Sequence, residues 1–175
     1  MTPDQLSPVA RSCWCYALVN SCLPHIRLQS EESGDDLAHW YKLLSKLQAF
    51  LTGELQSESN LQRFYEAFCD WRDTQTAGDS LNQRITALCL AATDAAVVLL
   101  SDNDCDDARL LPESMRDLYA ELADLGGPAA ELESYWNELS EEWTEALSAV
   151  RQRPVSKSAM HQICDVGVSP FGLED

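Results

Sequence analysis

The segment 88–100 limits the possible folds of this chain more than any other, because a helix formed from it is apolar on nearly every side. Its residues are Leu-Cys-Leu-Ala-Ala-Thr-Asp-Ala-Ala-Val-Val-Leu-Leu, and Asp94 is the one charged residue among them. Helices without a polar face lie in the middle of a protein, where other helices cover them. We therefore expect a central helix that Asp79 or Ser80 caps and that runs to about Leu100.

Apolar residues recur every three or four positions along most of the chain, which is the period of an amphipathic helix. Gly and Pro number seven each and fall mostly between these stretches, which favours helices over a turn-rich β fold. We expect an all-α protein: a single compact multi-helix domain over residues 1–175, with a short ordered C-terminal tail at 167–175 that begins at Gly167 as a helix cap. The seven expected helices cover about 8–22, 37–52, 59–77, 81–100, 112–125, 128–153 and 155–166.

The formal net charge of −17 arises from 29 Asp and Glu residues against 12 Lys and Arg residues. Such a charge repels the phosphates of nucleic acids and an anionic membrane surface, so we expect neither as a partner. It attracts a basic protein partner, most strongly at low salt. A highly soluble cytoplasmic surface explains the same charge without any partner.

The seven cysteines and the first residues of the chain bear on its compartment. The start, Met-Thr-Pro-Asp-Gln-Leu, has neither the basic region nor the apolar region of a signal peptide. No apolar run reaches the length that a membrane crossing requires. We therefore expect a cytoplasmic protein without a membrane segment, whose thiols stay free.

Asp94 is the first candidate for a functional side chain, because its neighbours on the central helix are apolar. A buried carboxylate must find a partner or take up a proton. The candidate partners are the amides of the C-terminal tail and the side chains of Arg27, Arg63 and Arg84. The structural interpretation is a hydrogen bond that pins the tail to the core, around which we expect the helices at 37–52, 59–77 and 128–153 to pack. The functional interpretation is a pocket acid.

His161 and Cys164 are a second candidate, because residues three apart on a helix are neighbours. The pair has the composition of an activated thiol or of half a metal site. The other histidines, His25 and His39, are isolated, and the sequence shows no oriented base or oxyanion cradle. We therefore expect neither a catalytic residue nor a cofactor. An enzyme that uses Cys164 and His161, or Asp94, would require a cleft that contains one of them.

Two further patterns imitate metal sites, and we expect neither to hold a metal. The EF-hand spacing is shared by Asp102, Asp104, Asp106 and Glu113, but Asp107 occupies the position where the calcium loop needs Gly. Cys13, Cys15 and Cys22 lie on one expected helix. Cys15 and Cys22 are about 10 Å apart along its axis, too far for one metal ion or one disulfide. Their structural interpretation is that of small buried apolar residues.

Two segments of the chain carry a family resemblance. Residues 92–100, Ala-Thr-Asp-Ala-Ala-Val-Val-Leu-Leu, resemble the alanine-aspartate-alanine helix of the YjaG-like family, an uncharacterised group of bacterial proteins classed as a domain of unknown function. Residues 167–173, Gly-Val-Ser-Pro-Phe-Gly-Leu, resemble the terminal glycine-valine-serine signature of that family. The resemblance runs over nearly the whole chain in order.

The resemblance implies an all-helical cytoplasmic protein and no known catalytic residue. It carries over Asp94 and Gly167 as matched positions only. Pro170 stands where the family has a polar residue, and the loop after Gly78 is shorter than in the family. Both departures concern the docking of the tail and the cover of the central helix.

These observations lead to two functional hypotheses. The first is a non-enzymatic binding or regulatory protein that acts through a helical face, which an exposed apolar patch larger than a few hundred Å² would support. The alternative is an acidic inhibitor or immunity-type protein that masks a basic partner, with carboxylates gathered on one face. The sequence leaves the oligomeric state open.

Overall fold

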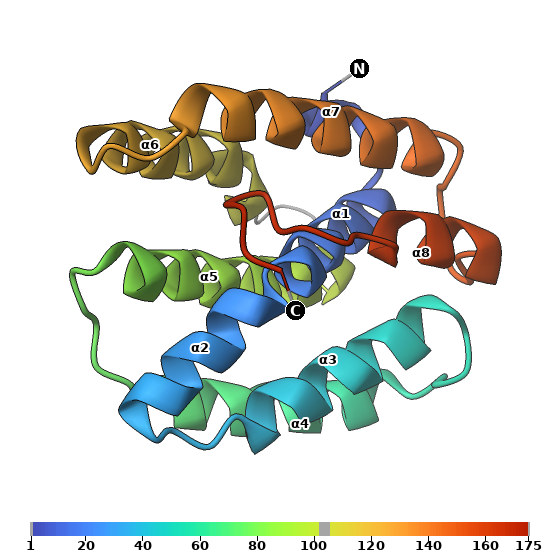
Figure 1. The fold of residues 1–175 in the computed structure, drawn as a ribbon. Helices are drawn as coiled ribbons and strands as arrows, with labels where there is room; N and C mark the ends of the chain where they lie inside the picture. Colours follow the sequence, from blue (N-terminus) through green and yellow to red (C-terminus); the bar gives the residue numbers. More distant parts are fainter. Residues whose placement is uncertain (1, 102–105, 175) are drawn as a thin grey trace.

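The computed structural model describes residues 2–101 and 106–174, which form eight α-helices and two short 3₁₀ helices (Figure 1). The predicted all-α fold is confirmed, with one helix more than the sequence pattern indicates. The α-helices are α1 (Pro8–Ser21), α2 (Leu23–Ser33), α3 (Ala38–Leu51), α4 (Glu58–Arg72), α5 (Leu81–Ser101), α6 (Leu111–Asp124), α7 (Ala129–Leu147) and α8 (Lys157–Cys164). The 3₁₀ helices are η1 (Pro3–Gln5) and η2 (Asp107–Leu110).

The helices lie in three layers (Figure 1). The α6–α7 hairpin forms the top layer, α1 and α5 lie in the middle, and α3 with α4 forms the bottom layer. The predicted central apolar helix is confirmed as α5, but its closest partner is α1, whose role the pattern did not reveal. Small side chains let the two backbones approach, and the buried Ser12 hydroxyl donates to the Ala96 carbonyl oxygen at 2.6 Å.

The expected set of neighbours around α5 is wrong in one respect. Helix α7 packs on α6, α8 and α1 instead of on α5. Helices α3 and α4 pack mainly on each other and reach α5 through long side chains. The reason is that α1, with ten buried residues, fills the place beside α5 that α7 would need.

Helix α2 is the element that the sequence pattern missed. The first expected helix ends near residue 22, and the next begins only at 37. Pro24 instead lies in the first turn of α2, where proline is tolerated because the N–H groups there have no helical partner. The residues 30–33, expected in a loop, form the last turn of this helix. Gly34 ends it in a left-handed conformation with φ of 77°.

Polar side chains cap several helices, and one of them is Ser80, which the sequence suggested for the central helix. The Ser7 hydroxyl accepts a hydrogen bond from the Ala10 amide at the start of α1. Ser80 and Gln83 bond each other reciprocally at the start of α5, which is a capping box. Asp36 accepts from the Ala38 amide at the start of α3. These side chains satisfy amides that the first helical turn leaves without partners.

The C-terminal tail, described here as residues 167–174, crosses the molecule between α7 and α2 (Figure 1). The helix before it ends at Cys164, and Gly167 has no left-handed conformation, so the expected cap at Gly167 is wrong. The tail is held by His25, Tyr119 and Tyr135, and the predicted pinning by Asp94 is therefore also wrong. Residue 175, which belongs to the predicted tail, lies outside the described residues.

Three indoles join α1 to α7. Trp14 of α1 meets Trp136 and Trp143 of α7 edge to face, with ring centroids 5.7 and 6.4 Å apart. The Trp14 indole N–H donates to the Ser140 hydroxyl at 3.2 Å. Edge-to-face pairs of this kind add to the stabilisation from apolar burial. All three indoles belong to the core, since each is at most 6% exposed.

Helix α5 has the length and the apolar composition of a membrane-crossing helix, being 21 residues long. The expectation that no segment reaches this size is therefore wrong. Half of its most apolar stretch is buried against the rest of the chain, and the core helix of a water-soluble protein meets the same criteria. The finding is thus weak evidence for a membrane segment.

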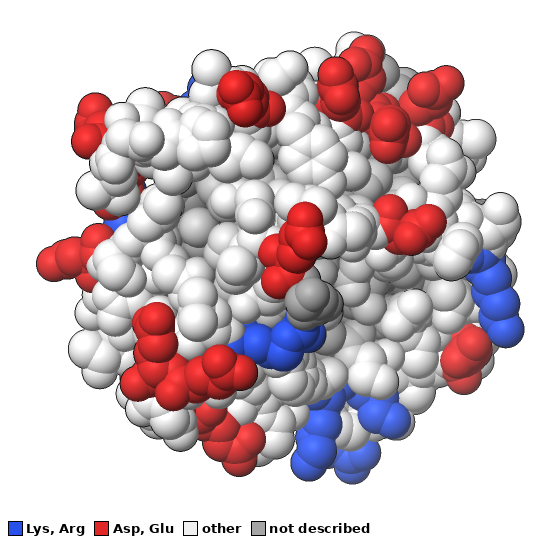
Figure 2. All heavy atoms as spheres, viewed as in Figure 1, with Lys and Arg blue, Asp and Glu red and all other residues white. Residues whose placement is uncertain are grey.

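Charged side chains are unevenly distributed over the surface (Figure 2). In this view carboxylates gather over α7 at the top and over the end of α2 at the lower left, while cations lie mainly along the lower edge and the right side. Residues 117–150 contain no Lys or Arg. Their nine acidic residues are Asp117, Glu121, Asp124, Glu131, Glu133, Glu138, Glu141, Glu142 and Glu145.

Candidate functional site

A cavity of about 180 Å³ lies where the end of α4 meets α2, α3 and the start of α5. Its apolar wall consists of Ile26, Leu37, Trp40, Trp71, Ala87 and Leu90. Polar side chains on its rim come from α2, from the segment before α3 and from the segment before α5. Most of these rim groups bond within the chain, as the Ser30 hydroxyl does with the Asp35 carbonyl oxygen at 2.6 Å.

Trp40 anchors the inner wall of this cavity and is fully buried. Its indole N–H donates to the Thr93 hydroxyl of α5 at 2.9 Å, and that hydroxyl donates in turn to the Cys89 carbonyl oxygen at 2.8 Å. The Trp40 ring lies 5.9 Å from Trp71 and 6.2 Å from Phe68, centroid to centroid. The aromatic cluster of α3 and α4 is therefore attached to α5 by one specific hydrogen bond.

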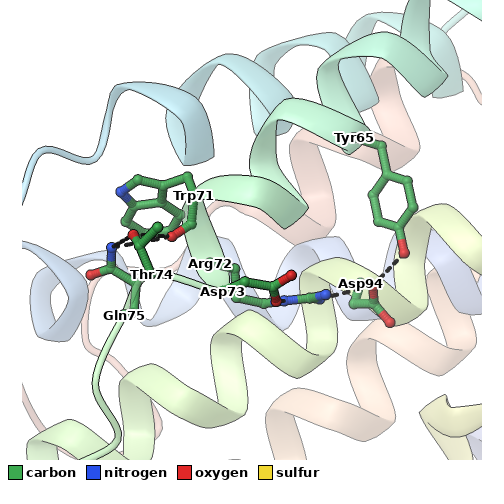
Figure 3. A network of polar contacts seen from close by, with 7 residues as sticks. All are labelled: Tyr65, Trp71, Arg72, Asp73, Thr74, Gln75 and Asp94. Atoms are coloured by element: carbon green, nitrogen blue, oxygen red, sulfur yellow. Dashed lines mark hydrogen bonds and ion pairs between the residues drawn. The ribbon is translucent and has the colours of Figure 1, made fainter.

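Asp94 lies beside this cluster and joins α5 to α4 (Figure 3). One of its carboxylate oxygens accepts hydrogen bonds from the Tyr65 hydroxyl and from Arg72 Nη1, the latter at 3.0 Å. The Arg72 guanidinium also lies over the Phe68 ring, lines the cavity and approaches Asp73 at 3.8 Å. Asp94 and Arg72 are 26% and 29% exposed, so the pair lies at the edge of the core.

The Tyr65 hydroxyl stays protonated in this arrangement. Burial is the main cause that raises its pKa, and the hydrogen bond to Asp94 raises it further. Tyr65 therefore acts as a hydrogen-bond donor and not as a base. Since Arg72 donates to the same carboxylate, the three side chains form a clamp between two helices.

Asp94 is thus partnered, but not as the sequence suggested. Of the proposed cations, Arg84 pairs with Glu121 and Arg63 bonds Asn60. The residues that sequence reasoning missed are Tyr65 and Arg72. They are seven positions apart and so lie on one face of α4 two turns from each other. That spacing was a usable signal.

His161 and Cys164 line a groove of about 450 Å³ between α3 and α8. His161 is exposed, Cys164 is half-buried, and among the described residues no hydrogen bond joins the two side chains. Burial raises the pKa of the Cys164 thiol to about 11. The thiol is therefore protonated near neutral pH, which makes it a poor nucleophile.

The remaining metal-like patterns give no site in the described part of the chain. No group of three His, Cys, Asp or Glu side chains within residues 2–101 and 106–174 is placed to hold a metal ion. Asp102 and Asp104 of the EF-hand-like loop lie outside those ranges, and Asp106 pairs with Arg11 at 3.3 Å. Cys13, Cys15 and Cys22 are buried free thiols.

Comparison of the chain with protein-family models, with curated proteins and with solved structures finds no match.

Proposed function

We propose that this chain is a non-enzymatic binding protein whose acidic hairpin, residues 117–150 of α6 and α7, docks a basic protein partner. The observation that carries the proposal is the absence of any Lys or Arg among these residues, which hold nine carboxylates. Seven of the nine are exposed, namely Asp117, Asp124, Glu131, Glu138, Glu141, Glu142 and Glu145. A surface of one sign speeds the encounter with an oppositely charged partner and selects for it.

The carboxylates of α7 form a stripe on its outer side. Glu138, Glu141, Glu142 and Glu145 are spaced by three, four and seven residues, so they share one helical face and lie within about 10 Å along the axis. Like charges at such spacing destabilise a helix by a few tenths of a kcal/mol per pair. A docked basic partner would offset that repulsion, which favours a binding role over a merely solvated surface.

A docking site of apolar type has less support. The large apolar side chains exposed among the described residues are Tyr41, Leu110 and Leu125, on α3, η2 and the end of α6. They lie on three different elements and do not extend one another in sequence. The charged face is therefore the better candidate.

The proposal leaves Cys164 and Asp94 without a chemical role. The thiol is protonated, and the carboxylate bonds two donors of the same chain. We further propose a cytoplasmic location, which the six free thiols of the described residues support. The resemblance to the YjaG-like family stays a prediction.

A pull-down from the native cell at low and at high salt tests the proposed partner. The decisive variant replaces Glu138, Glu141, Glu142 and Glu145 with Gln. A matched control replaces four exposed glutamates elsewhere, Glu31, Glu32, Glu58 and Glu66, and so changes the net charge equally. If each rim charge contributes about 0.5 kcal/mol, the hairpin variant binds roughly thirtyfold more weakly at low salt.

The outcomes distinguish a docking face on α7 from a general effect of net charge. A basic partner that high salt releases, that the hairpin variant loses and that the control retains supports the proposal. Equal loss with both variants shows a general effect of net charge and contradicts a docking face on α7. A partner retained by the hairpin variant at low salt contradicts it as well.

The cavity beside Trp40 and Trp71 supports a second candidate, the binding of a small molecule. Its aromatic wall and the single guanidinium of Arg72 have the composition of a ligand pocket, although its volume of about 180 Å³ admits only a small compound. Quenching of tryptophan fluorescence by a panel of metabolite-sized compounds tests this candidate. A Trp71→Phe variant that abolishes the quenching would locate the site.

A further inference from the structure

One imidazole connects the C-terminal tail to two helices. His25 of α2 places its Nε2 atom 2.6 Å from the Ser169 hydroxyl of the tail. Its Nδ1 atom lies 3.1 Å from Oδ1 of Asn82 on α5. His25 is 5% exposed and Ser169 is 1% exposed, so water does not compete for these bonds.

The partners fix which ring nitrogen carries the proton. The Asn82 amide nitrogen donates to the His25 carbonyl oxygen at 3.1 Å and to Gln29 Oε1 at 3.3 Å, so its oxygen faces the ring. An amide oxygen only accepts, and Nδ1 must therefore be the donor. In the neutral ring, Nε2 is then the acceptor for the Ser169 hydroxyl.

The hydrogen bonds that the Ser169 oxygen accepts leave its own proton free to point only at His25. It accepts hydrogen bonds from the amides of Phe171 and Leu173, both at 3.1 Å. With its proton directed to His25, every polar atom of this group has a partner. A protonated imidazole would direct a second N–H at that oxygen and would leave the hydroxyl proton without its acceptor.

The rest of the tail is held by contacts that do not titrate in the same pH range. The Tyr119 hydroxyl donates to the Pro170 carbonyl oxygen and the Tyr135 hydroxyl donates to the Val168 carbonyl oxygen, each at 2.6 Å. Burial raises the pKa of both tyrosines, so they keep their protons. The Phe171 ring stacks on Tyr119 with centroids 4.9 Å apart and meets the His25 ring edge to face at 5.8 Å.

We propose that the C-terminal tail is a pH-sensitive latch, which neutral His25 holds closed and protonated His25 opens. Opening uncovers an aromatic surface formed by Phe171, Tyr119 and the His25 ring. Its action does not depend on the partner proposed for α7.

The other titratable or charged groups on the elements around the ring do not replace His25 in this role. They include Cys22 where α1 ends, Arg27 of α2, Arg84 and Cys89 of α5, Tyr119 of α6, Glu133 and Tyr135 of α7, and Glu174 of the tail. None of these residue types ordinarily titrates between pH 5 and 7.5, whereas histidine does.

Burial lowers the pKa of His25, although its bond to Asn82 acts in the opposite direction. The closed tail is thus favoured above the ordinary histidine pKa of about 6.5 and loses that preference as the pH falls through the lowered value. Each pH unit by which the pKa is lowered makes the open tail about tenfold more populated at acid pH.

Nuclear magnetic resonance tests the latch on the full chain. The backbone order of residues 167–174 and the protonation of His25 are followed together from pH 7.5 to pH 5. We expect the tail amides to become mobile in step with the titration of His25, while the amides of α1 and α5 keep their order. The exposed histidines provide controls, since His39→Gln and His161→Gln should leave the transition unchanged.

A His25→Gln variant should remove the pH dependence of the tail, whether it leaves the tail ordered or mobile. The proposal is overturned if the tail of the natural chain stays ordered after His25 has titrated, or if His25 stays neutral down to pH 5. It is also overturned if a folded His25→Gln variant keeps the transition. Since the titration uses the natural chain, the test holds even if that variant does not fold.

Discussion

The hydrogen bond between Trp40 and Thr93 provides the sharpest test of how the bottom layer is attached to α5. A Thr93→Val substitution keeps the branched shape of the side chain and removes the hydroxyl that accepts the indole N–H. Because Trp40 is fully buried, no water can replace the lost acceptor. The variant therefore isolates the contribution of one polar contact between α3 and α5.

The expected loss of stability comes from the indole N–H of Trp40, which has no acceptor in the variant. A buried donor without a partner costs about 1–3 kcal/mol, and we take about 2 kcal/mol. For a domain of this size, each kcal/mol shifts the Tm by about 2–4 °C, so Thr93→Val should melt about 4–8 °C lower.

Thr144→Val is the matched control for this substitution. Thr144 is 1% exposed, and its hydroxyl donates to the Ser140 carbonyl oxygen one turn before it, as the Thr93 hydroxyl does to that of Cys89. Within the described parts of the chain, it accepts no hydrogen bond from another helix. Thermal unfolding followed by circular dichroism should give a clearly smaller change for Thr144→Val. Equal losses for the two variants would refute the importance of the Trp40 contact.

Three further predictions concern other parts of the chain. Asp94→Ala should lower the free energy of unfolding by about 1–2 kcal/mol and Tyr65→Phe by about 1 kcal/mol, measured by urea titration; no change in either would show that the partly exposed clamp contributes nothing. Cys164 should react with a disulfide reagent at pH 8 roughly a few hundred times more slowly in the native chain than in urea, since its thiol pKa is about 11; mass spectrometry of the labelled peptides would expose faster labelling, which would revive the activated-thiol hypothesis. Gly53→Ala should destabilise the chain more than Gly34→Ala. Both glycines are left-handed, which costs alanine about 1–2 kcal/mol, but only at Gly53 does the new methyl group meet a proline ring, 3.0 Å away; equal losses would contradict this contact.

The fold class was predictable because the apolar period is strong in most helices. The limits of α5 and the start of α4 agree with those that the pattern indicates, since Ser57 and Ser80 are polar caps before clear apolar stripes. Helix α4 ends at Arg72, before the expected limit near residue 77. Helix α2 was missed because its apolar residues are few and Pro24 is compatible both with the end of one helix and with the start of the next.

The packing partners were less predictable than the helices themselves. The residues of α1 include serines and cysteines that read as polar or reactive, yet ten of its fourteen residues are buried. Small polar side chains let α1 approach α5 closely, as Ser12 does at Ala96, and no single-helix pattern reveals that approach.

Only part of the candidate site was predictable, because its contacts also depend on how the helices pack. Asp94 stood out because it interrupts an apolar helix, but its partners lie on α4 and depend on how two helices are placed side by side. The isolated His25 showed no pattern at all in the sequence. Its role depends on Ser169, which is 144 positions away in the chain.

The five indoles of this protein are gathered in two places, with Trp14, Trp136 and Trp143 between α1 and α7, and Trp40 with Trp71 between α3 and α4. Within each group the neighbouring ring centroids lie 5.6 to 6.4 Å apart, so the fluorescence of a group depends on how its own helices pack. The top and bottom layers therefore each contain their own group of intrinsic fluorophores. Phenylalanine replacement in one group leaves the other as an intrinsic probe, so that detachment of either layer can be timed without an added dye.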